Sequence, residues 1–404
     1  MKTVIVGAGA SGLVAAIFAA RNHEEVTLIE RNDQVGKKLL ITGNGKCNYF
    51  NVHQELKYYN SSSHDLLKQI ITDDNLKNVL KLFSEIGIVP KIKNGYYYPY
   101  SELAVSVREA LKLECELLGV NIVNDVLVTK IVKNNAEFVI NNDIKADRII
   151  ICTGSKAFAK TGSDGNGYEL AKAFGHQIIK PLPALGALIG VKEKYLSLWS
   201  GVRCEAKIAL YENEKLLKEE LGELQLTDSG VSGIPAFNLS GIATRILDNG
   251  GQVKVVINFM PWCNSLDEVL DYLEKRSEVV TGRTTDQLLE GIFNYKLLKS
   301  LFTKCKINPL KYFDELNKKE KYALAQGLYE FTLEIIEMSS FDKSQVCSGG
   351  VPLTEVNLKT MESKIVKNLY FAGEILDVNG DCGGYNLTFA WISGMLSGKG
   401  GHNA

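Results

Sequence analysis

A short glycine pattern near the N-terminus constrains the fold of this chain more than any other feature. The sequence GAGASG at Gly7–Gly12 stands between an apolar run, Lys2–Val6, and an alanine-rich segment, Leu13–Arg21. The apolar run predicts a buried parallel strand, and the alanine-rich segment predicts a helix. A second apolar run, Val26–Glu30, follows the helix. Together these segments predict a strand–turn–helix–strand unit at the start of an α/β domain.

The residues of this turn suit a bound dinucleotide. Gly7 permits a tight turn, Gly9 lets the backbone approach a pyrophosphate, and Gly12 permits close packing of the helix on the strand. Ala10 and Ser11 stand at the start of the helix, where backbone N–H groups and the helix dipole favour a phosphate. The turn is therefore predicted to hold the phosphates of a cofactor.

An acidic residue follows the second predicted strand, at the position that binds the ribose in such a unit. Glu30 ends the second predicted strand, and an acid at this place accepts the ribose hydroxyls of adenosine. An acid also disfavours a 2′-phosphate, although Arg31 is adjacent. The unit therefore predicts FAD or NAD rather than NADP, and the motif alone does not separate the two.

Composition excludes several classes of protein. The 404 residues carry 46 Lys+Arg against 47 Asp+Glu, so the basic surplus of a nucleic-acid-binding protein is missing. The eight cysteines form no CxxC pair and there are five histidines, which argues against a metal site. Scattered cysteines indicate a reducing compartment, so we expect a cytoplasmic protein. The uncharged stretch Thr3–Ala20 contains the glycine turn, and no other stretch approaches the roughly 20 apolar residues of a membrane span.

The order of the predicted elements indicates one domain that is interrupted by an insertion. Segments 1–187 and 341–404 have an α/β pattern, and the second of them contains a buried strand at Asn368–Ala372. Residues 188–262 alternate as β-strands, and residues 263–340 are mainly helical. We therefore predict a Rossmann-like dinucleotide-binding domain that the C-terminal segment completes, with an inserted β-rich subdomain and a helical subdomain.

Three longer stretches resemble one family of flavoproteins. They read GKKLLITGNGKCN (36–48), ICTGSKAFAKTGSDGNGYELAKAFGH (151–176) and TMESKIVKNLYFAGEILDVNGDCGGYNLTFAWISG (360–394). The stretch LQLTDSGVSGIPAFNLS (224–240) is similar to the insertion of the same family. The chain resembles the two-dinucleotide-binding-domain flavoproteins. Among these it resembles a bacterial FAD family that includes aminoacetone-oxidase-like and bile-acid-dehydroreductase-like enzymes.

The resemblance implies FAD as the cofactor and indicates where it is held. Small residues at Gly43–Gly45 would lie against the flavin ring, with Lys46 where the family usually has Arg. Glu374 is implied to meet the ribitol or the pyrophosphate, and the helix after Gly384 to aim its N-terminus at the flavin pyrimidine. The implied cofactor contacts beyond Arg31 are Lys38, Gly43, Asn44, Gly45, Cys47, Asn48, Val128, Thr153, Gly154, Gly373, Glu374, Gly384, Tyr385, Asn386 and Leu387.

The glycines are clustered along the sequence, and these clusters also predict contacts with the cofactor. Many of the 36 glycines fall within residues 1–45, 154–175 and 349–401. Because glycine allows the backbone to approach a large ligand closely, we expect each of these clusters to lie against the cofactor.

No catalytic acid or base stands out. The candidates are Cys47, as a thiol near flavin or substrate, and the phenols of Tyr98 and Tyr385. Tyr98 belongs to an expected aromatic loop, Asn94–Tyr100, which is a candidate for lining the substrate pocket. The expected reaction is hydride transfer between the flavin and a small organic substrate, with the electron chemistry supplied by the cofactor.

The source of electrons stays open at this point. No second strand–GxGxxG–helix unit with a following acid is present, so a nicotinamide donor would visit the same pocket. One alternative is oxidation of a small amine, with oxygen reoxidising the flavin. Another is NAD(P)H-dependent reduction of a conjugated C=C bond in a steroid-like molecule. A flavin-dependent RNA-modifying or redox-sensing protein is the alternative from another class.

Overall fold

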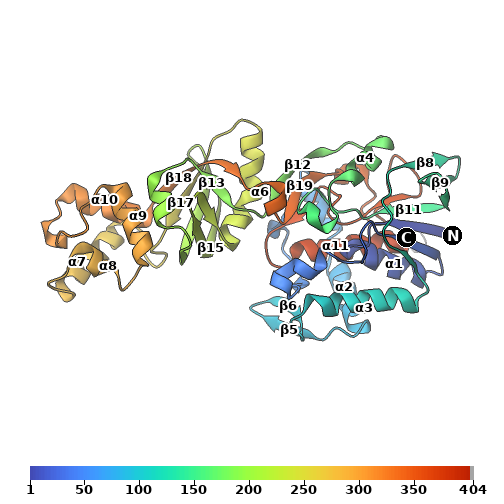
Figure 1. Cartoon of the computed structure of the whole chain (residues 1–404), viewed down its shortest axis with the longest axis horizontal. Coiled ribbons are helices and arrows are strands. Elements are labelled where there is room, and N and C mark those ends of the chain that lie inside the picture. The colour runs from blue at the N-terminus through green and yellow to red at the C-terminus, as the bar shows by residue number, and fades with distance from the viewer. Residues whose placement is uncertain (401–404) are drawn as a thin grey trace. The chain divides into compact units, whose positions relative to one another are not determined.

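The computed structural model describes residues 1–400 and divides the chain into two compact units (Figure 1). Unit 1 comprises Met1–Leu182 and Phe341–Ala404, and unit 2 comprises Pro183–Ser340. The last four residues of the predicted segment 341–404, including Gly401 of the third glycine cluster, lie outside the described residues. Within residues 1–400, no helix has the length and apolar character that crossing a membrane requires.

Unit 1 is built on a five-stranded parallel sheet with the order β20-β11-β1-β2-β7. Its strands are β1 (Lys2–Val6), β2 (Glu25–Ile29), β7 (Asn121–Val123), β11 (Arg148–Ile151) and β20 (Leu369–Phe371). Strands β1 and β11 are almost continuously apolar and buried, as expected of parallel strands that are covered on both faces. Strand β20 comes from the C-terminal segment and pairs with β11, so this segment completes the domain.

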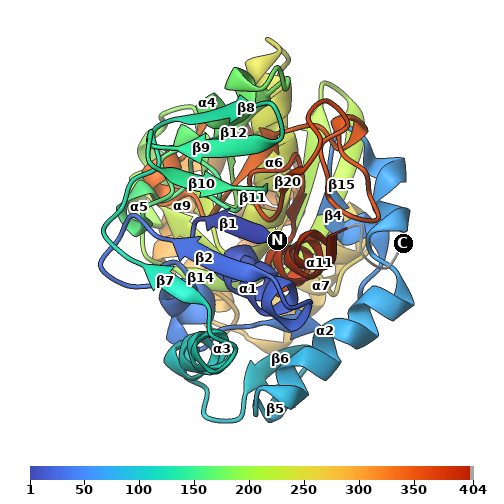
Figure 2. The same ribbon diagram turned by 90° about the vertical axis from the view of Figure 1, so that its right-hand side faces the viewer.

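Two helices far apart in sequence pack closely beside this sheet. The helices of unit 1 are α1 (Ala10–Arg21), α2 (Asp73–Glu85), α3 (Ala104–Leu117), α4 (Asn166–Ala173) and α11 (Tyr385–Lys399). Figure 2 shows α1 and α11 side by side next to β1 and β2. A Cβ atom on Gly394 would lie 2.5 Å from Ser11 O, and one on Gly398 would lie 2.5 Å from Ala15 O. These two glycines of the third cluster therefore serve contact between helices, contrary to the expected contact with the cofactor.

Four smaller sheets surround the parallel sheet. They pair β3 (Phe50–Asn51), β6 (Tyr96–Pro99) and β5 (Pro90–Lys93); β8 (Ile131–Asn134), β9 (Glu137–Ile140) and β10 (Ile144–Ala146); β12 (Ile179–Ala184) and β19 (Val346–Gly350); and β21 (Asn379–Gly380) and β4 (Tyr59–Asn60). The segment Asn94–Tyr100, expected as a loop, turns through Asn94 and Gly95 and then forms β6. The expectation was wrong because neighbouring tyrosines give no alternation, although aromatic residues favour strands.

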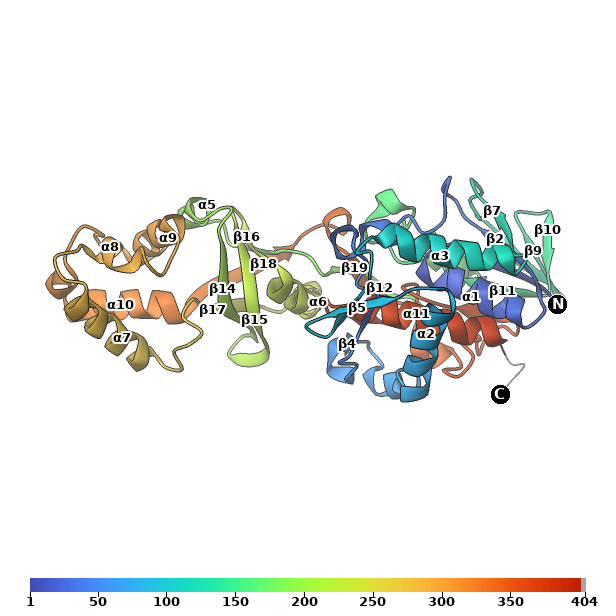
Figure 3. The ribbon, with the colours of Figure 1, turned by 90° about the horizontal axis from the view of Figure 1, so that it is seen from below.

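Unit 2 contains a closed β-barrel with the strand order β13-β16-β15-β14-β17-β18. Its strands are β13 (Leu188–Gly190), β14 (Arg203–Glu212), β15 (Lys215–Thr227), β16 (Gly230–Ser232), β17 (Val253–Asn258) and β18 (Phe331–Met338). Its helices are α5 (Lys194–Leu198), α6 (Ile234–Asp248), α7 (Leu266–Val279), α8 (Thr285–Leu289), α9 (Tyr295–Cys305) and α10 (Lys318–Tyr329). Figure 3 shows α7–α10 gathered at one end of the barrel strands. Strand β18 comes from the segment 263–340 that was expected to be mainly helical.

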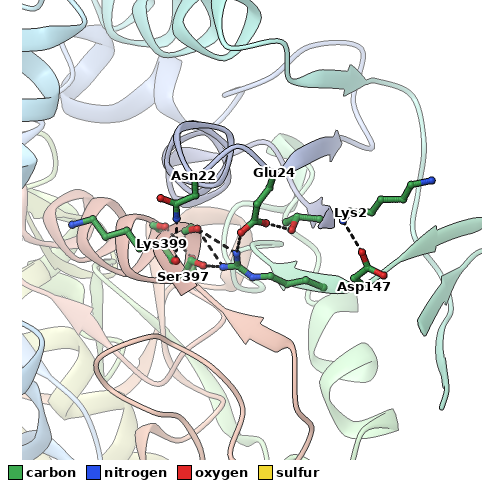
Figure 4. Close-up of polar contacts among 10 residues, drawn as sticks. Lys2, Asn22, Glu24, Asp147, Ser397 and Lys399 are labelled. Atoms are coloured by element: carbon green, nitrogen blue, oxygen red, sulfur yellow. Dashed lines mark hydrogen bonds and ion pairs between the residues drawn. The ribbon is translucent and has the colours of Figure 1, made fainter. Parts of the chain in front are cut away.

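A buried ion pair fixes the C-terminal end of α11. Arg148, at the start of β11, has a side chain that is 1% exposed and lies 2.7 Å from Glu24 Oε1. Its guanidinium also donates to the carbonyl oxygens of Ser397 and Gly398, which end α11 (Figure 4). Helix C-termini leave carbonyl oxygens without partners, and a cation satisfies them both by hydrogen bonding and through the helix dipole. Arg148 therefore ties α11 to the parallel sheet.

A buried histidine holds the segment that precedes β20. His176 Nδ1 lies 2.7 Å from Glu355 Oε2, and its Nε2 lies 2.7 Å from Ser363 Oγ. Burial lowers the pKa of His176 from its usual 6.5, and the hydrogen bond that His176 donates to Glu355 opposes this shift only in part. The folded protein therefore favours the neutral imidazole.

This lowered pKa predicts a loss of stability in mild acid. The unfolded chain binds the proton more readily, so the contribution of neutral His176 is present above about pH 6.5 and is lost as the pH falls through the folded-state pKa. Thermal melts between about pH 5 and pH 8 should show this decline. The variant His176→Gln, which does not titrate, should flatten it. An unchanged pH profile in His176→Gln would show that other groups cause the decline.

Candidate active site

The glycine turn has a geometry that requires glycine at two of its three positions. Gly7 has φ +100°, and a Cβ there would lie 2.5 Å from Cys152 O. A Cβ on Gly12 would lie 1.9 Å from Gly7 O. In contrast, a Cβ on Gly9 would meet no protein atom within 4 Å. The turn therefore packs tightly against β11 and leaves open space at Gly9, at the start of α1, where the sequence predicts the pyrophosphate.

The acid after β2 is buried beside this turn. Glu30 Oε2 accepts a hydrogen bond from Ala8 N at 2.9 Å, and Oε1 accepts one from Asn32 N at 2.9 Å. Arg31 forms an ion pair with Asp164 at 2.6 Å and donates to Gly162 O. The loop after β11 thus lies against the end of β2. The charge of Arg31, a predicted cofactor contact, is compensated by Asp164.

Two residues at the start of α1 differ in what they offer a ligand. Ser11 Oγ donates to Ala372 O at 3.2 Å, so its side chain joins α1 to the end of β20. A Cβ on Gly373 would lie 2.4 Å from Ser11 Oγ, which explains glycine at that position. Ala10 has no polar side chain and provides only its backbone N–H. The helix start therefore presents backbone rather than side-chain donors, as phosphate binding at a helix N-terminus needs.

Two buried hydroxyl groups without partners belong to the residue Thr153 after β11 and to Tyr168 in α4. Gly154 has φ +75°, and a Cβ there would lie 2.6 Å from Ser163 Oγ. Thr153 Oγ1 and the hydroxyl of Tyr168 are buried, and neither has a hydrogen-bond partner. Buried hydroxyl groups are costly when they are unsatisfied, so both require a bound group or an ordered water. Val128 is buried nearby in the fold, and its carbonyl oxygen accepts a hydrogen bond from Asn166 Nδ2 at 3.1 Å.

Two predicted contacts that are far apart in sequence form one cluster. Lys38 Nζ lies 2.7 Å from Glu374 Oε2, and Ser155 Oγ donates to the same oxygen at 3.2 Å. Gly373, which precedes the acid, has φ +77° and donates its N–H to Ser393 Oγ at 2.9 Å. Ser155, which directly follows the predicted contact Gly154, was missed as a site residue by sequence reasoning. The cluster places a cation and a carboxylate at the carboxyl ends of β11 and β20.

The two segments predicted to face the flavin ring come together. Gly43, Asn44 and Gly45 all have left-handed backbone conformations. The Asn48 side-chain amide lies 3.2 Å from Tyr97 O and 2.9 Å from Phe50 O, and its nitrogen donates to both. A Cβ on Gly384 would lie 3.0 Å from the Asn48 side chain. The loop after Leu39 and the turn before α11 are therefore in direct contact.

The start of α11 is held by its own polar side chain. Asn386 Oδ1 accepts from Gly380 N at 2.8 Å, and its Nδ2 donates to Gly380 O at 2.7 Å. Thr388 N is the first N–H that bonds within the helix, to Gly384 O. The preceding N–H groups, which include that of the half-buried Leu387, carry the positive end of the helix dipole. Asn51, which sequence reasoning missed, donates to Gly383 O at 2.9 Å and follows closely on the quoted 36–48 motif.

Three tyrosines lie beside the loop at Gly43–Gly45 and the turn before α11. A Cβ on Gly383 would lie 2.9 Å from Tyr96 and 3.0 Å from Tyr385, and one on Gly43 would lie 3.8 Å from Tyr98. Burial, followed by Tyr96 and Glu102, raises the pKa of Tyr98. Burial is also the main cause of the raised pKa of Tyr385, which stacks on Tyr58. Both phenols therefore stay protonated at neutral pH and act as hydrogen-bond donors rather than as bases.

The structure argues against thiol chemistry at Cys47. Its side chain is fully buried, and burial raises the pKa of Cys47 to about 12. The thiolate is the reactive form of cysteine, and burial disfavours this form at neutral pH. We therefore correct the expectation of a reactive thiol at this position.

The residues present fit a dinucleotide cofactor. The open space at Gly9, the buried acid Glu30 and the unsatisfied Thr153 hydroxyl lie along the carboxyl ends of β1, β2 and β11. Ligands of parallel α/β sheets bind at this edge. Lys38 supplies a cation for a pyrophosphate, and the loop at Gly43–Gly45 supplies exposed backbone.

Comparison with known proteins places the chain in a family. A family model described as the HI0933-like protein Rossmann domain matches residues 1–400. The chain belongs to this family. The match confirms the predicted family and the predicted Rossmann-like domain.

Individual relatives span nearly the whole chain. A 3-dehydro-bile acid delta(4,6)-reductase from Clostridium scindens is 36% identical over 98% of this chain and 97% of its own length. A ribosomal RNA dihydrouridine synthase from Haemophilus influenzae is 26% identical over 97% of this chain and 96% of its own. Among solved structures, a flavocytochrome c3 fumarate reductase covers 98% of this chain and 77% of its own, with 15% identity and a TM-score of 0.49.

Proposed function

We propose that this chain reduces a C=C bond that is conjugated to a carbonyl group in a steroid-like molecule, with NAD(P)H as the electron source. At the level of reaction class the chain is an FAD-dependent oxidoreductase. The family match over residues 1–400 and the 36% identity to a bile acid reductase support this class. The proposal of a conjugated C=C bond as the substrate is carried by one observation. Tyr96, Tyr98 and Tyr385 lie beside the glycines of the loop at Gly43–Gly45 and of the turn before α11.

Within the described residues, one glycine turn follows a strand of a parallel sheet in the way that holds a dinucleotide. Among the described residues, the parallel sheet with its glycine turn is the only five-stranded parallel sheet, and unit 2 is a barrel with helices. NAD(P)H therefore reaches the substrate side of the same site and leaves before the substrate binds. We also place the reaction in the cytoplasm, because all eight cysteines are free thiols.

The phenols supply what this reaction needs from the protein. FAD, held by the glycine turn, Glu30 and the Lys38–Glu374 cluster, supplies the two-electron chemistry when it is bound. A protonated phenol at Tyr98 donates a hydrogen bond to the substrate carbonyl and so stabilises the negative charge that develops on its oxygen. The N-terminus of α11 provides a positive potential beside the same segments. Reduction of the C=C bond adds one hydride and one proton, and the proton comes from solvent water. The reaction therefore requires no protein base, in agreement with the raised pKa values of Tyr98 and Tyr385.

Removing the hydroxyl group of Tyr98 tests this role. The variant Tyr98→Phe keeps the ring, so FAD binding should be unchanged, while kcat should fall roughly 100-fold because the hydrogen bond to the developing negative charge is lost. Tyr295→Phe is the matched control, since Tyr295 is 66% exposed at the start of α9 in unit 2. A Tyr98→Phe variant with unaltered kcat would remove Tyr98 from the mechanism.

The reaction itself is tested by product analysis. Purified protein is incubated with FAD, NADPH or NADH, and a 3-oxo-Δ4 steroid under anaerobic conditions. The proposal predicts a product that is heavier by two hydrogen atoms. Hydrogen peroxide formed from a small amine in air, without steroid reduction, would favour amine oxidation instead. Tight, salt-sensitive binding of ribosomal RNA would favour the RNA-modifying alternative, and FAD binding without any turnover would favour a sensor.

A further inference from the structure

Three lysines surround one carboxylate next to β5 and β6. Lys91 Nζ and Lys93 Nζ lie 2.5 Å and 2.6 Å from the carboxylate oxygens of Glu102, and Lys46 Nζ lies 3.7 Å from Oε1. We call these four residues the Glu102 cluster. Three cations against one anion leave two positive charges without compensation inside the cluster. Such an excess of positive charge attracts an anion that carries about two negative charges.

The cluster shares a strand pair with the tyrosines of the candidate active site. Lys91 is directly opposite Tyr98, and Lys93 is directly opposite Tyr96, in the antiparallel pairing of β5 with β6. Residues directly opposite each other in an antiparallel pair have side chains on the same face of the sheet. Lys46 comes from the other side of the site, directly after Gly45. The cluster thus lies beside the segments that are predicted to face the flavin ring.

Glu102 behaves as an internal counter-ion in this cluster. Hydrogen bonds from Lys91 and Lys93 lower the pKa of Glu102 to about 2, so the carboxylate stays charged. Glu102 has φ +53°, an uncommon conformation for this residue type, and its N–H donates to Pro99 O at 2.8 Å. All three lysine side chains are partly exposed, between 35% and 53%, so an external anion can reach them. Surface ion pairs are weak, and such an anion can therefore replace Glu102.

An exposed aromatic ring lies beside the cations. Tyr100 is 68% exposed, and Lys91 Nζ lies 5.8 Å from the centre of its ring. Aromatic faces stack well on nucleobases, independently of the base sequence. The surface therefore combines cations for phosphates with a ring for a base.

We propose that the Glu102 cluster holds the pyrophosphate of the nicotinamide dinucleotide that reduces this protein. The protein offers no second glycine turn for these phosphates in the described residues, so side-chain cations take over that task. The two uncompensated charges match the two negative charges of a pyrophosphate. Glu102 occupies the site between visits and is displaced when the dinucleotide binds. The proposal rests on the proposed function for the identity of the electron donor.

The test uses a dinucleotide fragment that cannot transfer electrons. ADP-ribose contains the pyrophosphate and the adenosine but no nicotinamide, and its Kd for the FAD-loaded protein is measured by titration calorimetry. The double variant Lys91→Gln/Lys93→Gln should raise this Kd roughly tenfold, and Glu102→Gln should lower it. Lys130→Gln/Lys145→Gln removes the same charge at a position just before β8 and at one within β10, and should leave the Kd unchanged.

Further measurements separate this proposal from its rivals. If the cluster holds the pyrophosphate, the binding of NADH and the binding of NADPH should weaken equally in the lysine variants. Weaker binding of NADPH alone would overturn the proposal in favour of a site for the 2′-phosphate. Weaker binding of a steroid carboxylate but not of its methyl ester, with unchanged ADP-ribose binding, would also overturn it. Bleaching of the flavin by NADH tests the proposed function separately, so a loss of ADP-ribose binding in the variants supports the cluster whatever that result is.

Discussion

Replacing Gly9 with valine is expected to abolish tight FAD binding while the fold stays intact. Gly9 has φ −80° and ψ −163°, which valine adopts readily, and a Cβ there meets no protein atom within 4 Å. The added side chain instead fills the space where the pyrophosphate is predicted to approach the backbone. We expect the Kd for FAD to rise at least about 100-fold, which corresponds to near 3 kcal/mol, with an unchanged melting temperature of the cofactor-free protein.

Gly12→Ala provides the matched comparison. A Cβ at Gly12 would lie 1.9 Å from Gly7 O, so the start of α1 must shift. Overpacking of this kind costs about 1–3 kcal/mol, and the cofactor-free protein itself should therefore melt at a lower temperature. If Gly9→Val bound FAD as tightly as the unaltered protein, the cofactor would not lie against this turn.

Removing the buried guanidinium of Arg148 is expected to destabilise unit 1 by about 3–5 kcal/mol. In Arg148→Met the buried carboxylate of Glu24 loses the cation that lies 2.7 Å away, although Thr3 Oγ1 still donates to it. The carbonyl oxygens of Ser397 and Gly398 lose their donors at the same time, as the positions of Glu24 and Ser397 in Figure 4 illustrate. Chemical denaturation followed by circular dichroism measures the loss.

A variant that also changes Glu24 provides the control for the Glu24–Arg148 ion pair. The double variant Glu24→Gln/Arg148→Met removes the uncompensated charge and should recover part of the lost stability. If Arg148→Met alone were as stable as the unaltered protein, Arg148 would not tie α11 to the sheet. Since α11 begins at Tyr385 in the candidate site, the single variant should also weaken FAD binding.

The elements around the glycine turn could be predicted because their signals are local. Apolar runs and the turn glycines located β1, α1 and β2 to within a few residues of their observed bounds. The strand of the C-terminal segment was equally clear, since Leu369–Phe371 is a short apolar run before a glycine. Local patterns suffice where a segment is apolar on both faces or has the helical period.

Contacts between distant segments could not be predicted from the residues alone. Lys38 and Glu374 were both candidates for the cofactor site, but their 2.7 Å ion pair depends on the packing of two loops. Gly394 and Gly398 were expected to lie against a cofactor, whereas they lie against α1. A glycine shows that the backbone approaches something closely, but its sequence context does not say what it approaches.

The most direct test of the account is an anaerobic visible-absorption titration of the purified, FAD-loaded protein. The account predicts that NADH or NADPH bleaches the absorption of oxidised FAD and that a 3-oxo-Δ4 steroid then restores it. A colourless protein that does not bind added FAD would contradict the central claim that this chain is a flavoprotein. FAD absorption that neither nicotinamide changes would contradict the proposed reaction.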